Sequence, residues 1–136
     1  QLEITSIACP LFVEYVERGE TSGDAITKIA QDYLAPMTAA KIDTLVLGCT
    51  HYPFLKKIIR RIVGDSITLI DTSDAVVRQL ARQLNQREIA APFKGHPSTL
   101  RLLSTANADT LQAMANRLLH SDLSKLRIET KTVQTE

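Results

Sequence analysis

Residues 43–55 read DTLVLGCTHYPFL, and the predicted fold follows from this stretch. Its apolar run Leu45–Leu47 is short and continuous, as in a parallel strand that is covered on both faces. Gly48 then lets the chain turn tightly. Pro53 suits the first turn of a helix, where its missing N–H has no partner to lose, and helical spacing continues to Val63. The stretch therefore predicts a buried strand, a turn and a helix.

A thiol and an imidazole lie between the predicted strand and the predicted helix. Cys49 and His51 would occupy the carboxyl end of the strand, the edge where open α/β sheets bind ligands. A thiol acts as a base or nucleophile only as the thiolate, which a nearby imidazolium or a helix N-terminus favours. The N–H groups of the helix start and the Thr50 hydroxyl would suit a substrate carboxylate. Alternatively, Cys49 is a small core residue, since free cysteines are often buried. The residues alone leave both interpretations open.

Strand-like and helix-like patterns alternate along the rest of the chain. We expect Gly19 to end the first helix, Thr21 or Ser22 to cap the second, and Pro36 to kink or end it. Such alternation is typical of the α/β class with a mostly parallel sheet. The other expected elements are a strand at 4–8, helices at 11–18 and 25–37, a strand at 66–70, a helix capped by 71–74, a strand at 99–104, a helix opened by Asn107 or Asp109, and an edge strand at 126–130.

The composition narrows the class of protein. The chain has 136 residues, a net charge of +1 and no basic stripe, so we expect no nucleic-acid partner. No apolar run approaches the ~20 residues of a membrane span, so we expect no membrane partner. Two cysteines are too few for a disulfide scaffold, which favours a reducing, cytoplasmic setting. The first residues lack an initiator Met and read as the middle of a strand, so we expect a fragment of a longer protein.

Several other polar residues have ordinary structural interpretations. Cys9 ends the first predicted strand without a nearby histidine, and we expect it to be a packing residue. Helix capping accounts for the polar cluster at 71–74. Glu17 is either an exposed charge at a helix end or a carboxylate that reaches a cleft. His96 and His120 are predicted to lie on the surface, and no spacing of Cys or His matches a zinc site. We therefore expect no metal.

The central stretch resembles a known enzyme family. Residues 47–53, LGCTHYP, closely resemble the second catalytic motif of bacterial glutamate racemase. The resemblance covers most of residues 4–120. Further segments similar to the family in order and spacing are 8–13 (ACPLFV), 16–19 (VERG), 41–45 (KIDTL) and 69–71 (LID).

The resemblance implies an isomerase of the aspartate/glutamate racemase fold, with two pseudo-symmetric, flavodoxin-like α/β lobes and no cofactor. In that family two cysteines face opposite sides of the substrate α-carbon, and one removes the α-proton while the other delivers one. Cys49 matches one of these cysteines, and His51 matches the histidine that assists it. Thr50 and His51 match positions that contact the substrate. Glu17 matches a carboxylate near the cleft, whereas Cys9 does not match the second catalytic cysteine.

The family's second cysteine, in a Cys-Asn-Thr motif, is absent from these residues. We therefore interpret the chain as the C-terminal half, inactive alone. Residues 1–70 would be the remainder of one lobe, and residues 71–136 would pack onto the other lobe.

The resemblance also implies a substrate and a cellular role. The full protein would interconvert L- and D-glutamate, supply D-glutamate for peptidoglycan, and could form a homodimer. Two alternatives remain open at this point. One is an aspartate or other amino-acid racemase of the same superfamily. The other is a non-catalytic binding module that keeps the fold.

Overall fold

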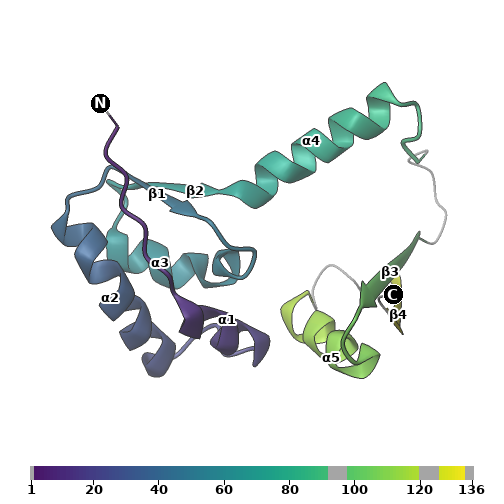
Figure 1. Ribbon diagram of the computed structural model, residues 1–136, viewed down its shortest axis with the longest axis horizontal. Coiled ribbons are helices and arrows are strands. Elements are labelled where there is room, and N and C mark those ends of the chain that lie inside the picture. The colour runs from purple at the N-terminus through teal and green to yellow at the C-terminus, as the bar shows by residue number, and fades with distance from the viewer. Residues whose placement is uncertain (1, 92–97, 120–125, 134–136) are drawn as a thin grey trace. The chain divides into compact units, whose positions relative to one another are not determined.

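The computed structural model describes residues 2–91, 98–119 and 126–133, and it divides into two compact units, 1–90 and 91–136 (Figure 1). Helices and parallel strands alternate within it, which confirms the α/β prediction. The first unit contains α1 (Pro10–Glu17), α2 (Asp24–Ala39), β1 (Thr44–Leu47), the 3₁₀ helix η1 (Tyr52–Leu55), α3 (Lys56–Val63), β2 (Thr68–Asp71) and α4 (Thr72–Gln86). The second contains β3 (Ser98–Ser104), α5 (Ala108–Leu118) and β4 (Leu126–Thr132).

The sheet of the first unit is covered on one face. Strands β1 and β2 pair in parallel, and Figure 1 shows α2 and α3 on the same side of them. Leu45 and Leu47 point into the core, whereas Val46 between them is 54% exposed. The prediction that both faces are covered is therefore wrong for the described residues. Side chains of a strand alternate between faces, so helices on one side cover only alternate positions.

The segment 4–8 was expected to be a strand, and this expectation is wrong. Residues 2–9 have no regular secondary structure, and Ile4 is 77% exposed. A strand needs a neighbour to take up its backbone hydrogen bonds. Among the described residues, β1 and β2 pair only with each other, so the apolar pattern at 4–8 has no ladder to join.

The second helix also differs from its prediction. It begins after Gly23, whose φ of 106° suits glycine, and neither Thr21 nor Ser22 is its N-cap. Pro36 lies inside the helix, which continues past it for one turn. Proline removes a single backbone hydrogen bond there, and the burial of Met37 favours continuation. At Pro36 the packing of the helix therefore outweighs the local signal of the proline.

The core of the first unit forms where α1, α2, η1 and α3 meet. Phe12 has its ring edge-on to Tyr33 and Tyr52, at centroid distances of 5.3 and 5.4 Å. Gly19, at φ 78°, ends α1 as predicted. The largest fully buried side chains are those of Phe12, Ile26, Leu55, Ile59 and Val16.

The second unit is a parallel pair of strands with one helix. Strands β3 and β4 pair along their full lengths, which confirms both predicted strands. The Asn107 side chain caps α5 by accepting hydrogen bonds from the backbone N–H groups of Asp109 and Thr110. The predicted start at Asn107 is thus confirmed, and Ala115 is the buried residue of this helix among those described.

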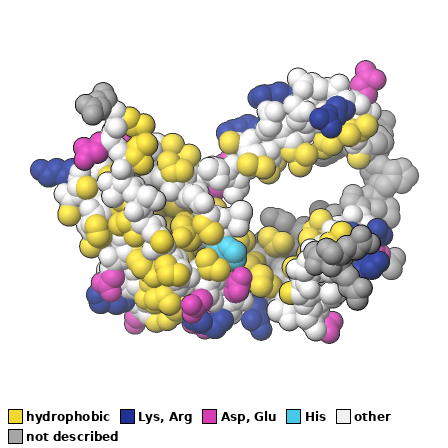
Figure 2. Space-filling view, viewed as in Figure 1, with side chains coloured by type: hydrophobic (Ala, Val, Ile, Leu, Met, Phe, Trp, Pro, Cys, Tyr) yellow, Lys and Arg dark blue, Asp and Glu magenta, His cyan; other side chains and the backbone are white. Residues whose placement is uncertain are grey.

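Helix α4 has an apolar face that no described residue buries. None of its residues is buried, and Val76, Val77 and Leu80 are 64%, 63% and 55% exposed. Figure 2 shows apolar side chains in a row along this helix, where they line a shallow groove of about 480 Å³.

Within the described ranges, no helix combines the length and apolar character required to cross a membrane.

Asp71 begins α4 as the predicted cap, and its side chain accepts a hydrogen bond from the Ser73 N–H at 3.0 Å. That N–H, helped by the Ser73 hydroxyl and by Lys56, lowers the pKa of the Asp71 carboxyl, against a smaller opposing effect of burial. A lowered pKa means that the stabilisation is present above the unfolded value of ~3.9 and is lost as the pH falls through the folded value.

We expect Asp71→Ala to lower the free energy of unfolding by about 1 kcal/mol at pH 7, as for other N-caps. The difference from wild type should vanish in acid, below the folded pKa of the carboxyl. Urea titrations followed by circular dichroism at several pH values measure both effects. Asp74→Ala, in the first turn of the same helix but without the cap contact, is the control and should cost only ~0.3 kcal/mol. Equal losses in the two variants would contradict the capping role.

Candidate active site

The candidate site is the loop that leaves β1 at its carboxyl end. Here the structure corrects the predicted helix: η1 intervenes, and α3 begins only at Lys56. The Tyr52 N–H donates to the Cys49 carbonyl, and the Phe54 N–H donates to the His51 carbonyl. Short 3₁₀ turns of this kind are common at the start of α-helices. The thiol therefore lies beside a 3₁₀ turn and not at the N-terminus of an α-helix.

Three of the predicted site residues come together. Cys49 Sγ lies 3.7 Å from His51 Nδ1, within hydrogen-bonding distance for sulfur. On the other side of the ring, His51 Nε2 lies 3.4 Å from Glu17 Oε1 at the end of α1. The Cys49 residue is partly exposed, and the His51 and Glu17 side chains are 28% and 48% exposed. A thiol, an imidazole and a carboxylate thus form a chain that solvent and a small molecule can reach.

A neutral histidine carries its proton on one ring nitrogen, and the partner of that nitrogen decides which one. A carboxylate only accepts hydrogen bonds, so Glu17 favours the proton on Nε2. Nδ1 is then free to accept a proton from Cys49. The arrangement is that of a nucleophile or base activated by an imidazole that a third group orients.

The other cysteine has a different environment. Cys9 is 7% exposed, and its thiol lies 3.8 Å from the Ile7 carbonyl oxygen. Burial raises the pKa of the Cys9 thiol, a hydrogen bond with Tyr52 opposes this, and the nearby Cys49 adds to it. These surroundings keep the Cys9 thiol protonated, in agreement with the packing role predicted for it.

The remaining candidates are placed as follows. Thr50 is exposed next to Cys49. Asp71 caps α4 and pairs with Lys56 at 3.3 Å. His96 and His120 lie outside the described residues. Across the parts of the chain that are described, no group of three or more His, Cys, Asp or Glu side chains could hold a metal ion.

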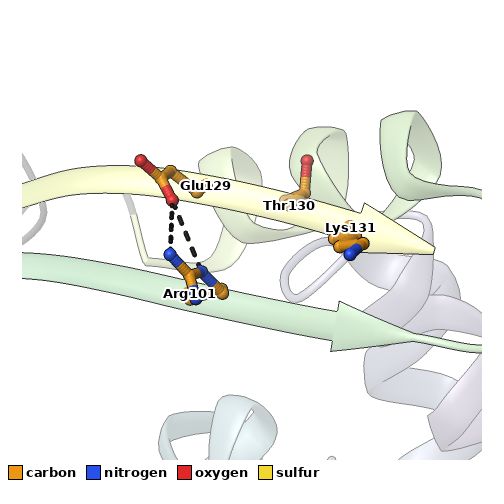
Figure 3. Close-up of a pocket in the computed structure, with 4 residues that line it drawn as sticks. All are labelled: Arg101, Glu129, Thr130 and Lys131. Carbon is orange, nitrogen blue, oxygen red and sulfur yellow. Dashed lines mark hydrogen bonds and ion pairs between the residues drawn. The ribbon is translucent and has the colours of Figure 1, made fainter. Parts of the chain in front are cut away.

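A groove of about 600 Å³ lies on the second unit. Figure 3 shows Arg101 of β3 reaching toward Glu129 of β4, at 3.2 Å, with Thr130 and Lys131 beside them. Ion pairs between facing residues are ordinary stabilising contacts of a sheet. The residues that line this groove include no nucleophile beside a base, so Cys49, His51 and Glu17 remain the candidate site.

Sequence reasoning missed the role of one residue, Tyr52. Tyr52 accepts a hydrogen bond from the Cys9 backbone N–H at 3.3 Å. It thereby connects the Cys49 loop with the start of α1. The only sequence signal was its position directly after His51, because a contact between residues 43 positions apart leaves no local pattern.

The chain was also compared with known proteins. No protein-family model matches the sequence. Glutamate racemase from Mycobacterium ulcerans is 41% identical over 117 residues, which are 86% of this chain and 43% of that protein. The crystal structure of a glutamate racemase isoform from Bacillus anthracis matches 98% of this chain and 47% of its own, with a TM-score of 0.80 and 29% identity.

A third match is the crystal structure of glutamate racemase from Francisella tularensis in complex with D-glutamate, with a TM-score of 0.77 and 27% identity over 97% of this chain and 47% of that one. The chain spans about half the length of the curated relatives that it matches. In sequence and in fold, the residues of this chain are similar to about half of a glutamate racemase.

Proposed function

We propose that the full-length protein interconverts L- and D-glutamate, and that this chain supplies one of its two proton-transferring thiols. The observation that carries the proposal is the contact chain from Cys49 through His51 to Glu17. The similarity to known proteins supports the choice of glutamate over aspartate, because the matched relatives and structures are named glutamate racemases. The D-glutamate bound in the Francisella structure supports a small amino acid as the ligand.

The chemistry follows from the geometry. His51 Nδ1 accepts the Cys49 proton, which leaves a thiolate. The thiolate takes the α-proton of the substrate, so that the Cα–H bond breaks, an S–H bond forms and the electron pair stays on the α-carbon. A second thiol, outside these residues, then delivers a proton to the opposite face. A single base would return the proton to the face it came from, so inversion needs both.

The other roles of the site residues belong to the same proposal. Thr50 and His51 contact the substrate, and Glu17 holds the His51 ring with its proton on Nε2. No cofactor takes part. Residues 1–70 complete the lobe that carries Cys49, and residues 71–136 pack onto the other lobe. The product serves peptidoglycan synthesis in the cytoplasm.

The proposal is tested by assaying the full-length protein with both enantiomers of glutamate and of aspartate, following optical rotation. We expect interconversion of glutamate in both directions, and none from residues 1–136 alone. Faster turnover of aspartate would favour the other racemases of the superfamily. Turnover of no amino acid would favour a binding module.

In the same assay, we expect Glu17→Gln to lower kcat by about tenfold. This loss is smaller than the ~10²–10⁴-fold rate contribution of a positioned general acid or base, because Glu17 acts only through His51. Glu20→Gln is the matched control. Glu20 lies just beyond the same helix, where it accepts a hydrogen bond from Arg18 at 2.9 Å, and its change should leave kcat within about twofold, as for most surface substitutions. Equal effects of the two changes would remove Glu17 from the mechanism.

A further inference from the structure

Tyr52 joins the two halves of the Cys49–His51–Glu17 chain. It directly follows His51 in sequence, so any movement of its backbone moves the imidazole. Its hydroxyl oxygen accepts the N–H of Cys9, the N-cap residue of α1. The first N–H groups of a helix have no partner within the helix, so this hydroxyl satisfies one of them. The hydroxyl thereby fixes the loop to α1, the helix that carries Glu17.

The ring of Tyr52 strengthens the same connection. It packs edge-on against Phe12 of α1, with interplanar angle 86°, and Phe12 is only 1% exposed. Edge-to-face pairs of this kind add about 0.5–1.5 kcal/mol beyond simple burial. Ring and hydroxyl together hold α1 and the loop at two points.

The contact between His51 and Glu17 needs such support. Both side chains are partly exposed, at 28% and 48%, and exposed ion pairs contribute ~0–1 kcal/mol because water screens them and their side chains lose freedom. The pair alone therefore does not hold a Nε2–Oε1 distance of 3.4 Å. Burial raises the pKa of Tyr52, which keeps its hydroxyl neutral beside the two thiols.

We infer that Tyr52 is a positioning residue, whose hydroxyl holds the Cys49–His51 loop against α1 so that Glu17 orients the imidazole. The inference rests on the proposed function. In this role Tyr52 acts only through the relative position of His51 and Glu17.

The chain offers a matched control in Tyr33. Its hydroxyl accepts the N–H of Leu11 at 3.4 Å, and its ring packs edge-on to Phe12 at 5.3 Å. Tyr33 therefore makes the same two kinds of contact with the start of α1. It lies on α2, however, and is not part of the segment that carries Cys49 and His51. A general effect on the stability of α1 should appear in both Tyr52→Phe and Tyr33→Phe. A positioning effect on the site should appear in Tyr52→Phe only.

The test uses the full-length protein with Tyr52→Phe, Tyr33→Phe, Glu17→Gln and the double variant Tyr52→Phe/Glu17→Gln. We expect Tyr52→Phe to lower kcat by about tenfold with KM changed less than about twofold, since small misplacements of catalytic groups cost rate and not uniform binding. Tyr33→Phe should keep kcat within about twofold while losing comparable stability in urea. In the Glu17→Gln background, Tyr52→Phe should lower kcat by less than about twofold, because the contact that it positions is already lost.

Three results would overturn the inference: wild-type kcat in Tyr52→Phe, an equal loss in Tyr33→Phe, or losses from Tyr52→Phe and Glu17→Gln that multiply fully in the double variant. A second readout needs no turnover. The rate at which iodoacetamide alkylates Cys49 at pH 7 should change by about threefold or more in Tyr52→Phe and not in Tyr33→Phe. If the wild type racemises no amino acid, the proposed function fails, and alkylation alone then decides whether Tyr52 positions the loop.

Discussion

Cys49→Ser is expected to lower racemisation by the full-length protein on the order of 10³-fold or more in both directions, as when other enzymes lose a residue that acts directly on the substrate. A serine hydroxyl in place of the thiol stays protonated near neutral pH, so His51 has no thiolate to generate. Circular dichroism of glutamate measures the racemisation rate from each enantiomer.

Proton exchange gives the sharper part of this prediction. The second thiol still reaches one face of the substrate in Cys49→Ser. One enantiomer should therefore exchange its α-proton with D₂O while keeping its configuration, which proton NMR detects. Exchange with inversion at the wild-type rate would reject the role given to Cys49.

The matched control makes the same substitution at the buried thiol. Cys9→Ser should keep racemisation within about threefold of wild type, because Cys9 is a buried residue at the start of α1 and the serine hydroxyl can still reach the Ile7 carbonyl. Loss of activity at both cysteines, with the fold intact, would instead place Cys9 in the chemistry.

Phe12→Ala should lower the free energy of unfolding by about 3–5 kcal/mol, the range for truncating a buried phenylalanine. The side chain is 1% exposed, and its loss leaves both Tyr33 and Tyr52 without their ring partner. Urea unfolding followed by circular dichroism measures the change. Phe54→Ala, at a phenylalanine that is 38% exposed, should cost less than about 1 kcal/mol. Similar losses at the two positions would mean that the aromatic cluster is not the core of this unit.

Local patterns in the sequence predicted the alternating elements well. The Gly19 stop and the Asp71 cap are confirmed, because each depends on the conformation or polarity of one residue and its immediate neighbours. The strand predicted at 4–8 is wrong, and the second helix continues through Pro36, where the sequence predicted a kink or an end. A strand exists only with a partner strand, and a helix with an internal proline persists when the packing around it is favourable.

The sequence by itself determined that a thiol and an imidazole follow an apolar strand, because two-residue spacing and a turn glycine place them there. Only the tertiary structure decided that the carboxylate of Glu17 faces that imidazole, and that Tyr52 fixes their positions. Both contacts bring α1 against a loop far along the chain, through the burial of Phe12 and its aromatic neighbours. Packing between distant segments depends on three-dimensional complementarity, which no local pattern records.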